Sequence, residues 1–226
     1  MLFGEILVNS VNLIAQQGGA MNWLTEKYVA GGIFMHPILA CLIIGLAFSI
    51  ERFWTLTRSS INTKNFIVKV KEALKAGGVE QAKELCMNTR GPVASVFYAG
   101  LLRADEGLES VEKAVMAYGA IEMGFLERGL IWINTCITIA PMLGFTGTVQ
   151  GMIESFDAIA AANQISPSIV ATGIAVALLT TLFGLVVAMI LQTIYNYFVS
   201  RIDRLVADME ESSIELIDAL YEIKSK

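Results

Sequence analysis

Threonine hydroxyls among small side chains are the polar groups best placed for chemistry in this 226-residue chain. Thr148 lies in one long apolar stretch and Thr181 in another, and each has a second threonine close by, Thr146 and Thr180. The small residues of these stretches recur every three or four positions: Gly144, Gly147, Gly151, Gly173, Ala177 and Gly184. Two such helix faces either line a shared cavity for an ion, or pack on each other while each threonine bonds the carbonyl four residues earlier. The spacing fits both interpretations.

Ionisable side chains are missing from the same two stretches. No Asp, Glu, Lys, Arg or His lies between positions 129 and 153 or between 169 and 200. Because a proton relay needs an ionisable group at membrane depth, ion movement would require a charge from a partner chain. Glu154 and Asp157 follow the first stretch, where they either gather cations at a pore mouth or cap and solvate the helix end. His36, the single histidine, is interpreted as an interface residue, and we expect no metal site.

The composition predicts the elements that position these groups. Hydrophobic residues make up 55% of the chain and charged residues 16%, and the mean hydropathy is +0.61, a balance that does not fit a soluble surface. Three uncharged stretches explain it, since an α-helix of ~20 residues crosses the ~30 Å hydrocarbon core of a bilayer. We predict an all-α polytopic membrane protein with transmembrane helices at 28–50, 129–153 and 169–198.

Other classes of protein are disfavoured by the same composition. The net charge of −5 and the absence of a basic run argue against a nucleic-acid partner. The three cysteines, at positions 41, 86 and 136, show neither metal-ligand spacing nor an even pairing, so we assign them no chemistry. No cluster of His, Cys or acidic residues indicates an enzyme.

The distribution of Lys and Arg near the span ends predicts the orientation in the membrane. Basic residues flank segment 51–128 and follow the third stretch, whereas the connection 154–168 has none and the amino-terminal tail 1–27 has only Lys27. We therefore expect a periplasmic amino terminus, a cytoplasmic segment 51–128, a short periplasmic loop 154–168 and a cytoplasmic carboxyl-terminal helix at 199–226. Tail 1–27 is predicted to be an amphipathic helix on the outer interface, with a cleaved signal as the alternative.

The cytoplasmic segment carries apolar residues at helical spacing, which predicts a helical bundle. Gly77–Gly78, Gly91–Pro92 and Asp105–Gly107 are predicted breaks between its helices, and the last helix should open near Ser110. The apolar pattern also continues beyond Ser200, so the third membrane helix is expected to run on as one helix of roughly 80 Å at ~1.5 Å per residue. A helix of that length requires neighbours from its own bundle or from other copies of the chain.

Three segments carry a family resemblance. They are SIERFWTL at 49–56, IAPMLGFTGTVQGMIESFDAIA at 139–160 and TGIAVALLTTLFGLVVAMILQTIYNYF at 172–198. In this order they resemble the ends and cores of the three spans of the MotA/TolQ/ExbB family of ion-driven motor subunits, most closely its ExbB/TolQ branch. The centres of the second and third segments, GTV followed by G and ALL followed by T and GLVVA, are the most specific parts.

The resemblance implies a homopentameric ring in the bacterial inner membrane, around the single spans of two ExbD/TolR-like partner chains. It implies that the partner supplies a carboxylate, which Thr148 and Thr181 of the ring face, with Thr146 and Thr180 as further hydroxyls. Hydroxyl oxygens hydrogen-bond a carboxylate or help to dehydrate an arriving cation. Flow of H⁺ or Na⁺, with no resident cofactor, would then turn the ring against its core and deliver work to a TonB/TolA-like transducer.

One position departs from the family pattern. Many family members carry a glutamate where this chain has Val176, one helical turn before Thr180. The change is either lineage variation or a change of ion route, for example toward sodium.

Several other functions stay open at this point. A passive membrane scaffold that recruits cytoplasmic partners predicts that valine in place of Thr148 or Thr181 is harmless. A gliding or flagellar-type stator is a close relative of the motor hypothesis, although the flagellar branch has four spans. A substrate transporter is disfavoured, because alternating access uses repeated halves that move against each other, and the three spans show no inverted repeats.

Overall fold

The computed structural model describes residues 19, 22–59, 63–162 and 167–224. Its elements are α2 (Met35–Ser59), α3 (Thr63–Met87), α4 (Pro92–Leu102), the 3₁₀ turn η1 (Ala104–Glu106), α5 (Leu108–Glu127), α6 (Leu130–Ala162) and α7 (Pro167–Lys224). Residues 22–30 form a further helical segment, and no strand occurs in the described ranges. The all-α prediction is confirmed, while most of the predicted amphipathic helix in 1–27 lies outside the described residues.

Among the residues that the structure describes, three helices are long and apolar enough to cross a membrane, and they lie in α2, α6 and α7. Many large apolar side chains on them are exposed, among them Phe145, Leu178 and Met189. Such side chains face lipid or other chains in a membrane protein. The predicted number of membrane helices therefore agrees with the structure.

The ends of two predicted segments differ from the structure. The predicted first span begins at residue 28, but its helix α2 begins at Met35, because the chain turns at residues 31–34 and Gly32 has a positive φ of 72°. The predicted loop 154–168 is largely helical, since α6 continues to Ala162 and α7 begins at Pro167. The acidic residues there do not end the helix: Gln150 Nε2 donates to Glu154 Oε1 one turn later, at 3.0 Å.

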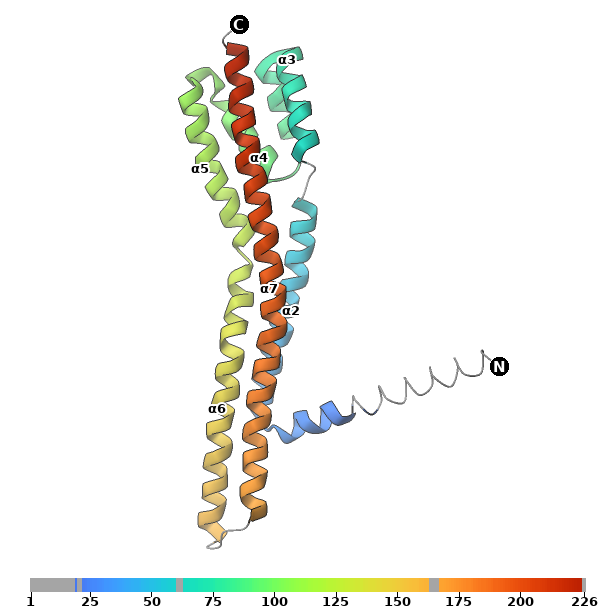
Figure 1. Cartoon of the computed structure of the whole chain (residues 1–226), viewed down its shortest axis with the longest axis vertical. Helices are drawn as coiled ribbons and strands as arrows, with labels where there is room; N and C mark the ends of the chain where they lie inside the picture. The colour runs from blue at the N-terminus through green and yellow to red at the C-terminus, as the bar shows by residue number, and fades with distance from the viewer. Residues whose placement is uncertain (1–18, 20–21, 60–62, 163–166, 225–226) are drawn as a thin grey trace, which may run out of the picture. The chain divides into compact units, whose positions relative to one another are not determined.

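The chain divides into two compact units, residues 1–45 with 134–192 and residues 46–133 with 193–226. In the second unit, α3, α4, α5 and the end of α7 share one apolar core (Figure 1). Its buried side chains include Phe66, Val70, Leu74, Phe97, Leu101, Val111, Met209 and Leu216. The predicted helical bundle is thus confirmed.

Glycines make the breaks in this bundle. Gly78 interrupts α3 with φ 71°, Gly91 precedes α4 with φ 132°, and Gly107 precedes α5 with φ 114°. Side chains with a Cβ rarely adopt such positive values, so the breaks lie where the sequence predicted them. The predicted continuous third helix is also confirmed, because α7 runs for 58 residues, or roughly 87 Å at ~1.5 Å per residue.

Candidate functional site

The first unit holds a close contact between α6 and α7, which run side by side in Figure 1. A Cβ on Gly144 would lie 2.9 Å from the Thr180 carbonyl oxygen, and one on Gly184 would lie 2.6 Å from the Ala140 carbonyl oxygen. A Cβ on Gly151 would lie 3.1 Å from the Gly173 carbonyl oxygen and one on Gly173 would lie 2.8 Å from that of Gly151, whereas a Cβ on Gly147 would lie 2.7 Å from the side chain of Thr180. Only residues without a Cβ allow this backbone approach, so both small-residue faces lie in one helix–helix contact, with Ala177 buried beside them.

Thr148 of α6 and Thr181 of α7 meet in this contact. Their hydroxyl oxygens are hydrogen-bond partners of each other. Thr148 Oγ1 lies 3.0 Å from the Ala177 carbonyl oxygen and 3.3 Å from that of Gly144, and Thr181 Oγ1 lies 3.2 Å from the Gly144 oxygen. Both side chains are half-buried. The structure therefore brings together the two threonines that the sequence singled out first.

Each hydroxyl has one proton to donate and two lone pairs to accept with. One of the two protons lies in the hydrogen bond between the hydroxyls, and the other is donated to a backbone carbonyl, that of Ala177 or of Gly144. Three of the four lone pairs on the two adjacent oxygens are then left to accept a hydrogen bond or to coordinate a cation. The arrangement is an acceptor pair fixed by the backbone of two helices.

The neighbouring threonines lie in different surroundings. Thr180 is 1% exposed, its hydroxyl donates to the Ala177 carbonyl at 2.9 Å, and a Cβ on Gly147 would lie 2.7 Å from it. Its side chain therefore lies inside the contact between α6 and α7. Thr146 is exposed on α6, and its hydroxyl donates within its own helix to the Met142 carbonyl at 2.8 Å.

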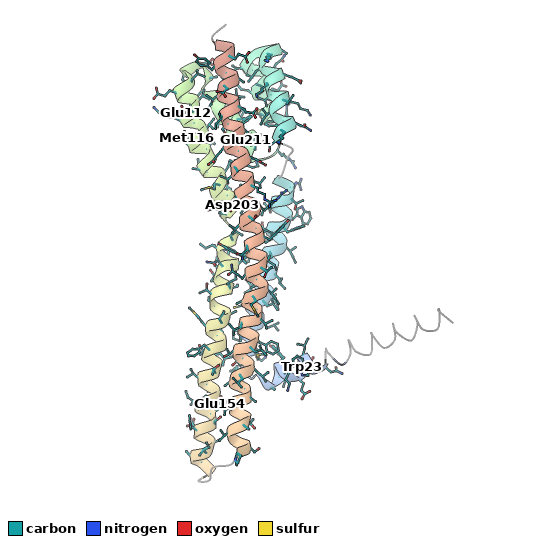
Figure 2. The ribbon with its side chains drawn as sticks, in the orientation of Figure 1. Trp23, Glu112, Met116, Glu154, Asp203 and Glu211 are labelled. Atoms are coloured by element: carbon teal, nitrogen blue, oxygen red, sulfur yellow. The ribbon has the colours of Figure 1, made fainter. Side chains whose placement is uncertain are left out.

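Other residues of the sequence prediction lie along the same two helices. Glu154, labelled in Figure 2, is exposed on α6. Asp157 is also exposed on this helix, and between them lies a buried Ser155 whose hydroxyl donates to the Gly151 carbonyl at 2.9 Å. Val176 is half-buried, and its Cγ1 would lie 3.8 Å from a Cβ on Gly32. Position 176 therefore lies beside the turn that precedes α2.

Sequence reasoning missed one pair of groups. The thiols of Cys41 on α2 and Cys136 on α6 are hydrogen-bond partners, and both cysteines are free. The residues are far apart in the chain, and their sequence positions carry no signal for this contact. Within the described ranges, no three His, Cys, Asp or Glu side chains gather as a metal site would require.

Comparison with known protein families identifies the class of protein that has this fold. The model of the MotA/TolQ/ExbB proton channel family matches residues 88–211, which is more than half of the chain. The chain belongs to this family, which confirms the resemblance seen in the sequence.

Individual relatives agree with the family assignment. The chain is 34% identical over 193 residues to a putative biopolymer transport protein ExbB homolog of Methanothermobacter thermautotrophicus, covering 85% of this chain and 67% of that protein. It is 27% identical over 211 residues to biopolymer transport protein ExbB of Salmonella typhimurium, covering 82% and 84%. It is also 34% identical over 102 residues to Tol-Pal system protein TolQ of Pseudomonas aeruginosa, covering 45% and 44%.

Proposed function

We propose that this protein is the ring subunit of an ion-driven motor in the bacterial inner membrane, which couples the flow of H⁺ or Na⁺ to mechanical work. The observation that carries the proposal is the Thr148–Thr181 acceptor pair, placed in helices that have no ionisable side chain at membrane depth. Membership of a proton channel family supports it. The names of the ExbB and TolQ relatives point to biopolymer transport or Tol-type envelope function as the work that is powered.

The charge that the two helices lack comes from a second protein in this proposal. A carboxylate on the single span of an ExbD/TolR-like partner faces the hydroxyl pair from inside a pentameric ring. When that carboxyl is protonated, its O–H donates to a free lone pair of the threonines. When it is ionised, a threonine turns its own O–H from the backbone carbonyl to the carboxylate. A hydroxyl can serve both states because it donates and accepts.

Work follows from changing which ring position is most stable. An isolated charge in a dry environment is strongly unfavourable, so an ionised carboxylate favours the ring position with the best hydroxyl contacts. Protonation or cation binding removes that preference and releases the partner to the next subunit. Rotation of the ring against its core then reaches a TonB/TolA-like transducer through the partner's outer domain, with the ring's amino termini periplasmic and its carboxyl termini cytoplasmic.

The experiment is cation flux through the reconstituted complex. The chain is co-expressed with an ExbD/TolR-like single-span protein, incorporated into vesicles, and tested under separate proton and sodium gradients. Thr148→Val and Thr181→Val keep the shape of the side chain and remove the hydroxyl. Thr138→Val is the matched control, because Thr138 is an exposed α6 threonine whose hydroxyl donates to its own helix, at 3.0 Å from the Asn134 carbonyl.

We expect the flux to fall about tenfold or more in Thr148→Val and in Thr181→Val. The reason is that a lost hydrogen bond to a charged group costs ~1.5–3 kcal/mol, which corresponds to at least that factor. Thr138→Val should conduct like the wild type, and all variants should still assemble. Flux driven by the sodium gradient would favour a change of ion route at Val176, and flux driven by the proton gradient would favour lineage variation there. The variant Thr146→Val tests whether this exposed hydroxyl also belongs to the ion path. Normal work by both pair variants would support the scaffold alternative instead.

A further inference from the structure

The second unit contains a cavity that the motor function does not use. Its volume is about 460 Å³, within the range of small-molecule sites. It is lined by the end of α2 and the turn before α4, through Glu51, Trp54, Thr55, Arg58, Arg90 and Gly91. Two arginines from distant parts of the sequence therefore line the same cavity.

The charges around the cavity leave it electropositive. Glu51 is held by its neighbour Arg52, whose Nε and Nη2 donate to the two carboxylate oxygens at 2.8 and 2.7 Å, and Thr55 Oγ1 lies 3.2 Å from Oε1. The hydrogen bonds from Arg52 lower the pKa of Glu51 despite partial burial, so its charge is both present and compensated. Arg58 and Arg90 form no ion pair within the described residues.

The backbone adds to this positive potential. Gly91 lines the cavity and is the residue before α4, where it provides no side chain to cap the helix. Helix α4 has 11 residues and begins with Pro92. The amino-terminal end of a helix carries partial positive charge and attracts anions. Two arginine forks and a helix end thus favour the same ligand, an oxyanion such as a phosphate group.

The position of the cavity along α2 points to the source of that phosphate. Glu51 is the first charged residue after the uncharged stretch, and the segment from Glu51 to Arg58 covers ~10 Å of helix. The headgroup layer of a bilayer is ~5–8 Å thick on each side. Trp54 is 70% exposed and Phe53 and Ile50 are also exposed, as expected of side chains at the boundary between acyl chains and headgroups.

We propose that this cavity binds the phosphate of an anionic phospholipid, with Arg58 and Arg90 on the phosphate and Trp54 against the glycerol and upper acyl chain. The site would fix the end of α2 to one leaflet and to the α3–α4 turn. This inference does not depend on the ion path or on the motor function.

The test is lipid binding by the intact purified protein in detergent, followed by native mass spectrometry. Short-chain phosphatidylglycerol is compared with short-chain phosphatidylcholine, and inorganic phosphate is added as a competitor. The variants are Arg58→Gln and Arg90→Gln, with Arg90→Lys to separate charge from the guanidinium fork. Arg128→Gln is the matched control, because Arg128 is an exposed arginine beside the α6 apolar stretch and does not line the cavity.

We expect phosphatidylglycerol to bind more tightly than phosphatidylcholine, and its affinity to fall about tenfold in each glutamine variant, as for loss of a charge-assisted hydrogen bond. Arg90→Lys should fall between wild type and Arg90→Gln, and Arg128→Gln should stay within about twofold of wild type. Equal affinity for the two lipids would overturn the proposed phosphate site. An equal loss of affinity in all three glutamine variants would overturn it as well. Displacement by inorganic phosphate at the same concentration as the lipid would overturn its assignment to a phospholipid. The helical content and oligomeric mass of each variant confirm that it is folded.

Discussion

Replacing Gly184 with alanine tests the close contact between α6 and α7 that holds the threonine pair. The new Cβ would lie 2.6 Å from the Ala140 carbonyl oxygen, where ordinary contact begins at 3.4 Å. Because the opposing atom is backbone, the helices must separate by about 0.8 Å, and overpacking of this kind forces backbone shifts.

The separation also lengthens the hydrogen bonds of the pair. The distance from Thr148 Oγ1 to the Ala177 carbonyl oxygen, now 3.0 Å, would exceed the limit of a hydrogen bond. Overpacking destabilises by ~1–3 kcal/mol, and a hydrogen bond between membrane helices contributes ~0.6 kcal/mol. We therefore expect Gly184→Ala to lower the free energy of unfolding by about 2–4 kcal/mol.

Unfolding by sodium dodecyl sulfate, followed by circular dichroism, measures this change. Gly119→Ala is the control, because a Cβ there meets no atom within 4 Å. Alanine in place of a helical glycine should then raise stability by ~0.5–1 kcal/mol. If Gly184→Ala unfolds at the same detergent concentration as the wild type or as the control, the close-contact reasoning is refuted.

Three further predictions concern the second unit. Phe97 is 1% exposed in the bundle core, so Phe97→Ala should destabilise the bundle by ~3–5 kcal/mol in thermal unfolding, and a loss below about 1 kcal/mol would contradict this packing. Burial raises the pKa of the Cys86 thiol from 9.0 to about 12, so this thiol stabilises the fold fully below pH 9 and progressively less as pH rises toward 12. The free energy of unfolding of Cys86→Ala should therefore fall less steeply than that of the wild type between about pH 9 and pH 12. Lys71 Nζ lies 2.5 Å from Glu215 Oε2, but the side chains are 38% and 42% exposed, so Lys71→Gln should lower stability by under ~1 kcal/mol and only at low salt.

Local signals explain which parts of the fold were predictable. Gly78, Gly91 and Gly107 take positive φ values, and glycine is the residue that permits them, so these breaks are visible in the sequence. The long helix α7 was predictable because its apolar spacing continues without a proline or glycine after Gly184. The helix through Glu154 was not predicted, because a charged residue after an apolar stretch suggests a loop, whereas Gln150 and Glu154 support each other one turn apart.

The register between helices explains which parts of the site were not predictable. Thr180 and Thr181 are adjacent in sequence, so their side chains point about 100° apart on the helix. Only packing against α6 shows that Thr180 is buried at Gly147 while Thr181 meets Thr148. The contact of Cys41 with Cys136 and the shared cavity of Arg58 and Arg90 join distant segments in the same way.

The most direct test of the central claim is whether Thr148 and Thr181 act as one unit in ion flow. The measurement is the flux of the reconstituted complex for the wild type, each valine variant and the double variant Thr148→Val/Thr181→Val. Because residues that act as a unit have non-additive effects, the double variant should conduct no less than the more impaired single variant, within about twofold. Losses that multiply would show two independent hydroxyls, and wild-type flux in the double variant would contradict the account.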